Sequence, residues 1–103
     1  MHKINEEILA IIKAIPAGKV AGYGQIAAYV GLANGARTVA RLLHSCSDKH
    51  DLPWWRVLHS SGEIALPLDG GGGLQKELLL TEGVTFCSPC KVDMAGCAWI
   101  LND

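Results

Sequence analysis

The 103-residue sequence has no long hydrophobic run, few charged residues and no excess of charge of either sign. No stretch approaches the roughly 20 consecutive apolar residues that a membrane-spanning helix requires, so we expect no contact with a membrane. Charged residues make up 18% of the chain and hydrophobic residues 50%, a balance typical of one folded domain and not of a disordered segment. The formal net charge of −1 argues against a uniformly basic nucleic-acid-binding protein, but a local basic stripe is compatible with it.

The sequence is also poor in metal-binding patterns. Its four cysteines are Cys46, Cys87, Cys90 and Cys97. Residues 87–90 form one Cys-X-X-Cys motif, but a second such motif or a spaced histidine pair is missing, so we expect no metal and no cofactor. The apolar run in residues 1–15 is interrupted by Glu6, Glu7 and Lys13, which favours an amphipathic helix over a signal peptide. We therefore expect a cytoplasmic protein with reduced thiols.

Hydrophobic periodicity predicts a mainly α-helical fold with a small β wing, in one domain that spans residues 1–103. Helices are expected at residues 4–14, 24–31, 36–46 and 74–83. The second and third are joined by a short glycine-containing turn, as in a helix-turn-helix. The segment RVLHSSGEIAL, from Arg56 to Leu66, predicts a β-hairpin that turns at HSSG. We expect residues 67–73 to be a mobile glycine-rich loop and residues 87–103 to be an irregular, cysteine-containing tail.

The expected helix at 36–46 has two different faces. Its apolar face carries Val39, Leu42, Leu43 and Cys46. Arg37, Arg41 and His44 fall within about 60° of one another on the opposite face. From these residues alone, a solvated polar face is the preferred interpretation. The alternative is a recognition helix that presents two fixed cations to DNA.

Four segments, in the right order, resemble the DNA-binding domain of the O6-alkylguanine-DNA alkyltransferases. They are IPAGKVAGYGQIAAYVG, ARTVARLL, PWWRVLHSSGEI and KELLLTEGV. The resemblance covers about residues 4–86, and the distance from Arg37 to Trp54 fits the family without a gap. In that family a recognition helix with an arginine is followed by an active-site Pro-Cys-His-Arg-Val. The resemblance implies a winged helix-turn-helix of the alkyltransferase C-terminal domain type.

The sequence departs from this family at the two residues that carry the chemistry. Trp54 stands where the alkyltransferases have the acceptor cysteine, and Trp55 stands where they have the histidine that deprotonates it. Alkyl transfer needs a thiolate and a base, whereas an indole is a hydrogen-bond donor only. The resemblance therefore implies an alkyltransferase-like protein. This non-enzymatic relative binds O6-alkylguanine in duplex DNA, flips it out of the helix and directs it to nucleotide excision repair.

The resemblance also assigns roles to single residues. Tyr23 is expected to crowd the phosphate beside the target nucleotide, and Arg37 to fill the gap that the flipped base leaves. The expected DNA contacts, made in the minor groove, are Tyr23, Gln25, Ala36, Arg37, Arg41, His44 and Ser60. The expected lesion pocket is formed by Tyr23, Trp54, Trp55, Arg56 and Ser60. Without the resemblance, Tyr23 would be a half-buried core aromatic and Arg37 a solvated charge.

The resemblance also gives expectations for four residues, some of which have other neighbours here than in the alkyltransferases. Trp55 either packs into the space of the usual histidine or enlarges the apolar surface for bulky adducts. Arg56 is expected to brace the site and not to touch DNA. Glu82 matches the glutamate that orients the missing histidine, so we expect it to have lost its partner and to act as a cap or a pocket acceptor. Cys46 replaces an asparagine that braces a turn, and packing is expected to take over that role.

Two other functions remain open at this point. One is a residual alkyltransferase that uses another cysteine, with Cys46 as the first choice. The other is a winged-helix transcriptional regulator that reads DNA sequence in the major groove. The preferred interpretation has double-stranded DNA containing O6-alkylguanine as its partner, nucleotide excision repair proteins as further partners, and a monomer as the working form.

Overall fold

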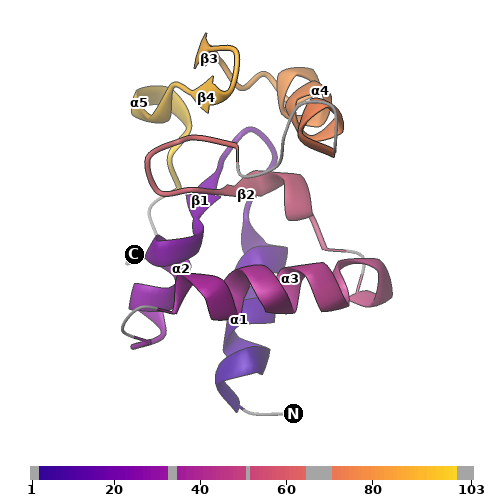
Figure 1. The fold of residues 1–103 in the computed structure, drawn as a ribbon, viewed down its shortest axis with the longest axis vertical. Coiled ribbons are helices and arrows are strands. Elements are labelled where there is room, and N and C mark those ends of the chain that lie inside the picture. Colours follow the sequence, from indigo (N-terminus) through magenta and orange to yellow (C-terminus); the bar gives the residue numbers. More distant parts are fainter. Residues whose placement is uncertain (1–2, 33–34, 51, 65–70, 100–103) are drawn as a thin grey trace.

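The computed structural model describes residues 3–32, 35–50, 52–64 and 71–99, without the side chains of Lys3 and residues 45–50. Figure 1 shows two groups of helices on either side of a small central sheet. The first group consists of α1 (Lys3–Ala14), α2 (Tyr23–Tyr29) and α3 (Ala36–His50). The second consists of α4 (Gly73–Thr81) and α5 (Met94–Cys97). No helix in the described part of the chain is long and apolar enough to cross a membrane.

The central sheet has two short strands in parallel. The strands β1 (Ala21–Gly22) and β2 (Val57–Leu58) pair with Ala21 opposite Val57 and Gly22 opposite Leu58. Successive side chains of a strand point to opposite faces, and β2 follows this rule. Val57 lies in the hydrophobic cluster of the first helix group, whereas Leu58 lies in that of the second. The sheet therefore joins the two halves of the core.

The helices bury the faces that their periodicity predicts. In α1, Ile8 and Ile12 are completely buried. In α3, Val39 and Leu43 are buried, whereas the side chains of Arg37, Arg41 and His44 are exposed. The two faces predicted for this helix are thus confirmed for its described side chains. The helix continues to His50, four residues beyond its expected end at Cys46.

Two helices end at the expected glycines. Gly31 follows α2 with a φ of 82°, and Gly83 follows α4 with a φ of 90°. Glycine adopts this left-handed conformation without a steric penalty, and it lets the next residue's N–H satisfy a free carbonyl of the helix. The N–H of Leu32 donates to the carbonyl of Ala27, and the N–H of Val84 donates to that of Leu79.

The expected β-hairpin at residues 56–66 is wrong in its pairing. The turn forms, because the N–H of Gly62 donates to the carbonyl of His59 at 2.8 Å. The strand before it pairs with β1, since Val57 and Leu58 are fully buried and belong in the centre of the core. The segment after it reaches another part of the chain: Glu63 bridges to Lys91. Residues 65–66 lie outside the described residues.

The C-terminal segment is not the expected irregular tail. The strands β3 (Phe86–Ser88) and β4 (Lys91–Val92) form an antiparallel hairpin, which leads into α5. Val92 and Cys97 are buried in the second cluster, and Trp99 packs against the first. Burial of these apolar side chains gives the segment its regular structure. Of the expected loop at 67–73, residues 67–70 lie outside the described residues, and Gly73 already belongs to α4.

Candidate functional site

The two adjacent tryptophans serve different halves of the core. They form a single 3-10 turn, Trp54–Arg56, directly before β2. Their rings lie nearly perpendicular, at 88°, with centroids 6.1 Å apart. Trp54 packs against the first hydrophobic cluster and Trp55 against the second, and both stay partly exposed. The pair is therefore held from both sides and retains an open edge.

Glu82 binds the tryptophan turn from the end of α4. The indole N–H of Trp55 donates to Oε2 of Glu82 at 2.9 Å, and the backbone N–H of Gly18 donates to Oε1 at 3.1 Å. The expectation that Glu82 has lost its partner is wrong, because an indole N–H serves as the donor. This geometry favours the packed interpretation of Trp55, with its polar edge directed at the carboxylate.

Arg56 is the second support of the turn. Its Nε lies 3.0 and 3.1 Å from the two carboxylate oxygens of Glu82, and its Nη2 lies 2.5 Å from Oε2. Its Nη1 donates to the carbonyl of Ile15 at 2.8 Å, and the guanidinium lies 5.2 Å from the centroid of the Trp55 ring. These contacts direct the guanidinium into the protein, which agrees with the bracing role expected for Arg56.

The carboxylate of Glu82 stays charged at neutral pH. Burial alone would raise the pKa of Glu82, but hydrogen bonds from Arg56, Trp55 and Gly18, together with the charge of Arg56, hold it below its ordinary value. Side-chain exposure is 14% for Glu82 and 16% for Arg56, so solvent screens this pair only in part.

Gln75 is a support that sequence reasoning missed. It is 2% exposed, and its side-chain amide donates to the carbonyls of Trp55 and Val57 at 3.1 and 3.0 Å. These two bonds fix the backbone that carries the tryptophans into β2. No local signal identifies such a residue, because its partners lie about 20 positions earlier in the chain.

Tyr23 and Ser60 come together at one edge of the central sheet. Ser60 presses on the backbone before α2: a Cβ on Gly22 would lie 2.4 Å from Oγ of Ser60 and 2.6 Å from its Cα. Tyr23 follows Gly22 and is half-buried, and burial raises the pKa of its hydroxyl. Its ring meets His59 edge-on, with centroids 5.9 Å apart and planes at 67°. Sequence reasoning missed His59, which lies 36 positions from Tyr23.

Gln25 uses both ends of its side-chain amide inside the protein. Its Oε1 accepts from the N–H of Gly22 at 3.1 Å, and its Nε2 donates to the carbonyl of Trp99 at 2.6 Å. Gln25 therefore ties the first turn of α2 to the C-terminal segment. Its contact with DNA stays a prediction.

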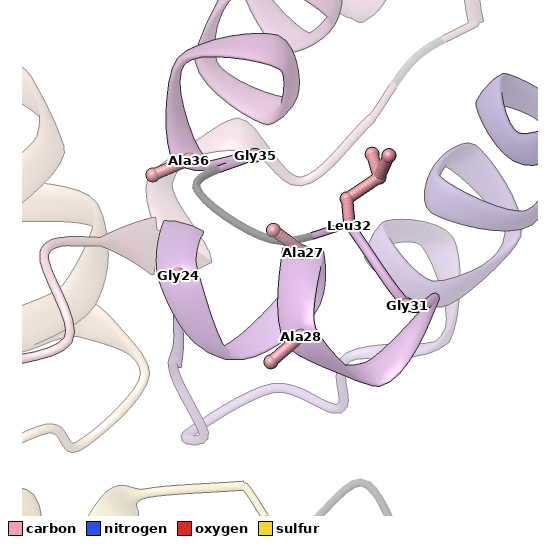
Figure 2. A pocket seen from close by; sticks show the side chains of 7 residues that line it. All are labelled: Gly24, Ala27, Ala28, Gly31, Leu32, Gly35 and Ala36. Atoms are coloured by element: carbon pink, nitrogen blue, oxygen red, sulfur yellow. The ribbon is translucent and has the colours of Figure 1, made fainter.

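A hollow of about 460 Å³ lies between α2 and the start of α3. Figure 2 shows that its lining comes from α2, from the residues that follow it, from Gly35 and from Ala36, the first residue of α3. The lining residues are Gly24, Ala27, Ala28, Gly31, Leu32, Gly35 and Ala36. None of them belongs to the expected lesion pocket. Ala36 borders the hollow directly before the exposed Arg37, so small apolar residues surround the start of the candidate recognition helix.

The cysteines have different environments. Cys87 and Cys90 are exposed on the β3–β4 hairpin, whereas Cys97 is buried and its thiol donates to the carbonyl of Asp93 at 3.1 Å. Burial, supported by the charge of Asp93, raises the pKa of the Cys97 thiol. The side chain of Cys46 lies outside the described part, so its expected packing stays a prediction. Among the described residues, no three histidine, cysteine or acidic side chains gather as metal ligands.

Comparison with known proteins places these features in a family. The family model of the 6-O-methylguanine DNA methyltransferase DNA-binding domain matches residues 3–84. The chain belongs to this family. It is 37% identical to a DNA base-flipping protein of Vibrio parahaemolyticus, over 96% of this chain and 98% of that one. It is 35% identical to alkyltransferase-like protein 1 of Schizosaccharomyces pombe, over 82% of this chain and 79% of that one.

Solved structures of the family share the fold. The structure of S. pombe Atl1 in complex with damaged DNA containing O6-carboxymethylguanine matches with a TM-score of 0.84 and 30% identity, over 98% of both chains. The Mycobacterium tuberculosis O6-methylguanine methyltransferase matches with a TM-score of 0.58 and 26% identity, over 80% of this chain and 49% of that one. The resemblance to the alkyltransferase-like proteins and the mainly helical fold are thereby confirmed.

Proposed function

We propose that this member of the family is a non-enzymatic sensor of alkylated DNA. It binds duplex DNA that carries O6-alkylguanine through the minor groove and turns the lesion into a pocket beside Trp54. Support comes from relatives named for base flipping and from the likeness to an Atl1 structure bound to damaged DNA.

The observation that carries the proposal is the anchored tryptophan turn, which the resemblance aligns with the reactive Pro-Cys-His-Arg-Val segment of the alkyltransferases. The N–H of Trp55 is bound to Glu82, which is itself paired with Arg56. This turn contains no thiol, its indoles accept no proton, and the Glu82 carboxylate is engaged by Trp55 and Arg56, whereas alkyl transfer requires a thiolate and a base that deprotonates it. Trp54 instead offers an aromatic surface, and contacts between a base and an aromatic ring are worth about 1–3 kcal/mol. That gain is similar to the few kcal/mol that flipping a damaged base costs.

The described cysteines support the same conclusion. A reactive cysteine needs a lowered pKa and an accessible sulfur. Cys97 is buried with a raised pKa, and Cys87 and Cys90 lie on the β3–β4 hairpin outside the tryptophan turn. None of the three lies within the turn Trp54–Arg56, which the resemblance aligns with the acceptor site.

The proposed DNA surface runs along α3. Arg37 and Arg41 present two guanidinium groups on the exposed face of this helix, with His44 beside them. Arg37, at the start of the helix, would enter the base stack, because a planar guanidinium stacks and donates hydrogen bonds at the same time. Tyr23, at the start of α2, would push on the adjacent phosphate.

Because a sensor leaves the adduct on the DNA, other proteins must remove it. We propose the nucleotide excision repair proteins as the partners that take over the marked lesion. The bound protein and the distorted duplex would together form the signal.

The test is a titration of the protein against two duplexes that differ only in one O6-methylguanine, at stated salt because phosphate contacts make affinity salt-dependent. We expect tighter binding to the methylated duplex, an adduct that is unchanged after incubation, and a protein of unchanged mass. Equal affinities would contradict lesion recognition. A methyl group gained by the protein would identify an alkyltransferase, and a strong consensus selected from random duplexes would identify a sequence-specific regulator.

A further inference from the structure

The two strands of the central sheet place Tyr23 and His59 at the same edge. In a parallel pair the carboxyl ends of both strands meet, so the residues that follow them are neighbours. Tyr23 follows Gly22 of β1, His59 follows Leu58 of β2, and Gly22 and Leu58 are paired. The contact of the two rings at 5.9 Å is therefore a direct consequence of the register.

The turn that carries His59 is fixed by its own backbone and by its neighbours. The N–H of His59 donates to the carbonyl of Glu63 at 3.0 Å, and the carbonyl of His59 accepts from Gly62. Ser60 rests against Gly22 so closely that no side chain fits there. His59 is nevertheless exposed, whereas Tyr23 is half-buried. The fixed turn thus places an exposed imidazole edge-on against the tyrosine ring.

We propose that His59 and Tyr23 bind one DNA phosphate together, with the imidazole as a second donor that also fixes the direction of the tyrosine ring. This inference rests on the proposed function, in which Tyr23 meets the phosphate beside the flipped nucleotide. A phenol donates one hydrogen bond, and a protonated imidazole donates two. Charge-assisted hydrogen bonds to phosphate are about twice as strong as neutral ones. The Tyr23 hydroxyl is a hydrogen-bond donor at neutral pH, and burial raises its pKa further.

A phosphate contact from a histidine makes binding depend on pH. Histidine changes its charge between pH 5 and 8, and a phosphate favours the charged form. Among the described residues, the other ionisable groups around this turn are the Tyr23 hydroxyl from α2, Glu63 of the turn itself and Lys91 of β4, which lies opposite Glu63. Glu63 and Lys91 carry opposite charges. Lesion binding is therefore expected to strengthen as the pH falls from 8 to 6.

The experiment compares the wild type with His59→Phe and His59→Ala at pH 6 and pH 8, using a duplex with one O6-methylguanine. Phenylalanine keeps a ring against Tyr23 and removes the donors, whereas alanine removes both. At pH 6 we expect His59→Phe to weaken binding about tenfold and to lower the salt slope by about one phosphate contact. We expect a smaller loss at pH 8, and a larger loss at both values for His59→Ala.

A double-mutant cycle tests whether the two rings share the phosphate. Tyr23→Phe removes only the hydroxyl. If both side chains bind the same phosphate, the double variant Tyr23→Phe with His59→Phe should lose less affinity for the duplex than the product of the two single fold-losses. The same series in a His44→Phe background separates His59 from the other histidine on the proposed DNA surface. The pH effect linked to His59 should persist there.

Three outcomes decide the inference. The inference that both residues bind one phosphate is refuted by either of two results. One is that His59→Phe binds the duplex like the wild type at pH 6. The other is that the affinity losses of His59→Phe and Tyr23→Phe multiply fully in the double variant. If the wild type prefers the methylated duplex and His59→Phe shows the expected losses, the inference stands. If the wild type binds both duplexes equally but keeps the pH and salt effects linked to His59, lesion recognition fails while the phosphate pair is supported.

Discussion

The indole N–H of Trp55 donates to the carboxylate of Glu82 across 27 positions of sequence. The same carboxylate pairs with Arg56 and accepts the N–H of Gly18, so one acidic side chain joins the turn after α1, the tryptophan turn and the end of α4. An ionised, partly buried carboxylate with several charge-assisted donors is a strong local anchor. The position of the tryptophan turn therefore depends on a residue 27 positions away that accepts the indole N–H of Trp55.

Replacement of Glu82 by glutamine should destabilise the protein. Glutamine keeps one acceptor but leaves the partly buried guanidinium of Arg56 without its counter-charge, which costs about 1–3 kcal/mol. We expect a thermal midpoint that is lower by about 4–8 °C for each kcal/mol lost. Glu77→Gln, at an exposed position of the same helix, is the matched control and should unfold like the wild type. Equal midpoints for the two variants would contradict the anchor.

Acid should lower the free energy of unfolding of the wild type, because it protonates Glu82. The pKa of Glu82 is lower in the folded protein than its ordinary value of 4.5, because hydrogen bonds from Arg56, Trp55 and Gly18 outweigh the opposing effect of burial. A lowered folded-state pKa gives stability that is complete above pH 4.5 and is lost as the pH falls through the folded value. Denaturant unfolding between pH 3 and 7 should show a decline below pH 4.5. That decline should be shallower in Glu82→Gln, and parallel curves would exclude Glu82 as its source.

Replacement of Arg37 by alanine should weaken DNA binding without loss of stability. The side chain is exposed, so its removal costs the folded protein little, whereas a guanidinium in the base stack contributes about 1–3 kcal/mol. We expect an affinity for the methylated duplex that is lower by a factor of about ten or more. Lys13→Ala removes another exposed cation, on α1, and should have a much smaller effect. Similar losses for both variants would indicate general electrostatics instead of a specific contact.

Replacement of Trp54 by cysteine should not restore alkyl transfer. The new thiol would stand beside Trp55, which cannot accept its proton, so little thiolate would form at neutral pH. Mass spectrometry after incubation with a methylated duplex should show no gain of a methyl group. A second variant, Trp54→Cys with Trp55→His, supplies a base within the same turn and is the one in which a gain is expected. Methylation of the single variant would show that the base is dispensable.

Replacement of Gly22 by alanine should disturb the edge of the sheet that carries Tyr23. The added Cβ would meet both the side chain and the Cα of Ser60, so the turn at 59–62 would have to move. Overpacking of this kind costs about 1–3 kcal/mol. Gly96→Ala is the control, since a Cβ at that position meets nothing within 4 Å. If Gly22→Ala unfolds at the same denaturant concentration as Gly96→Ala, the close approach of Ser60 has no energetic weight.

Local patterns predicted the helices α1 to α4 but missed the short α5, and they predicted the strands poorly. The apolar face of α3 and the glycines after α2 and α4 are local features, and they were correctly assigned. Val57 and Leu58 instead depend on the meeting of two hydrophobic clusters, because each belongs to a different one. A parallel pairing between residues 21–22 and 57–58 leaves no periodic signal in either segment. The hairpin expected from a good turn sequence was therefore paired with the wrong partner.

The site divides in the same way. The family resemblance identified the tryptophan turn and the bracing role of Arg56, but it treated Glu82 as a residue without a partner. Assignment by family position expected a histidine as the partner of Glu82, so it missed that the indole N–H of Trp55 serves as the donor. No sequence motif marked His59 or Gln75 as part of the site, because the residues that they contact are distant in the sequence and are brought near only by the fold.

The link from Gly18 and Arg56 to Glu82 spans 64 and 26 positions, and this has a consequence for biosynthesis. During translation the tryptophan turn emerges well before Glu82. The indole N–H of Trp55 therefore lacks its carboxylate partner until α4 and Glu82 have been made. Closing contacts between distant positions is slow compared with winding a helix. A chain arrested before α4 would expose apolar aromatic side chains that chaperones bind. The surface that binds DNA would be among the last parts of the protein to form.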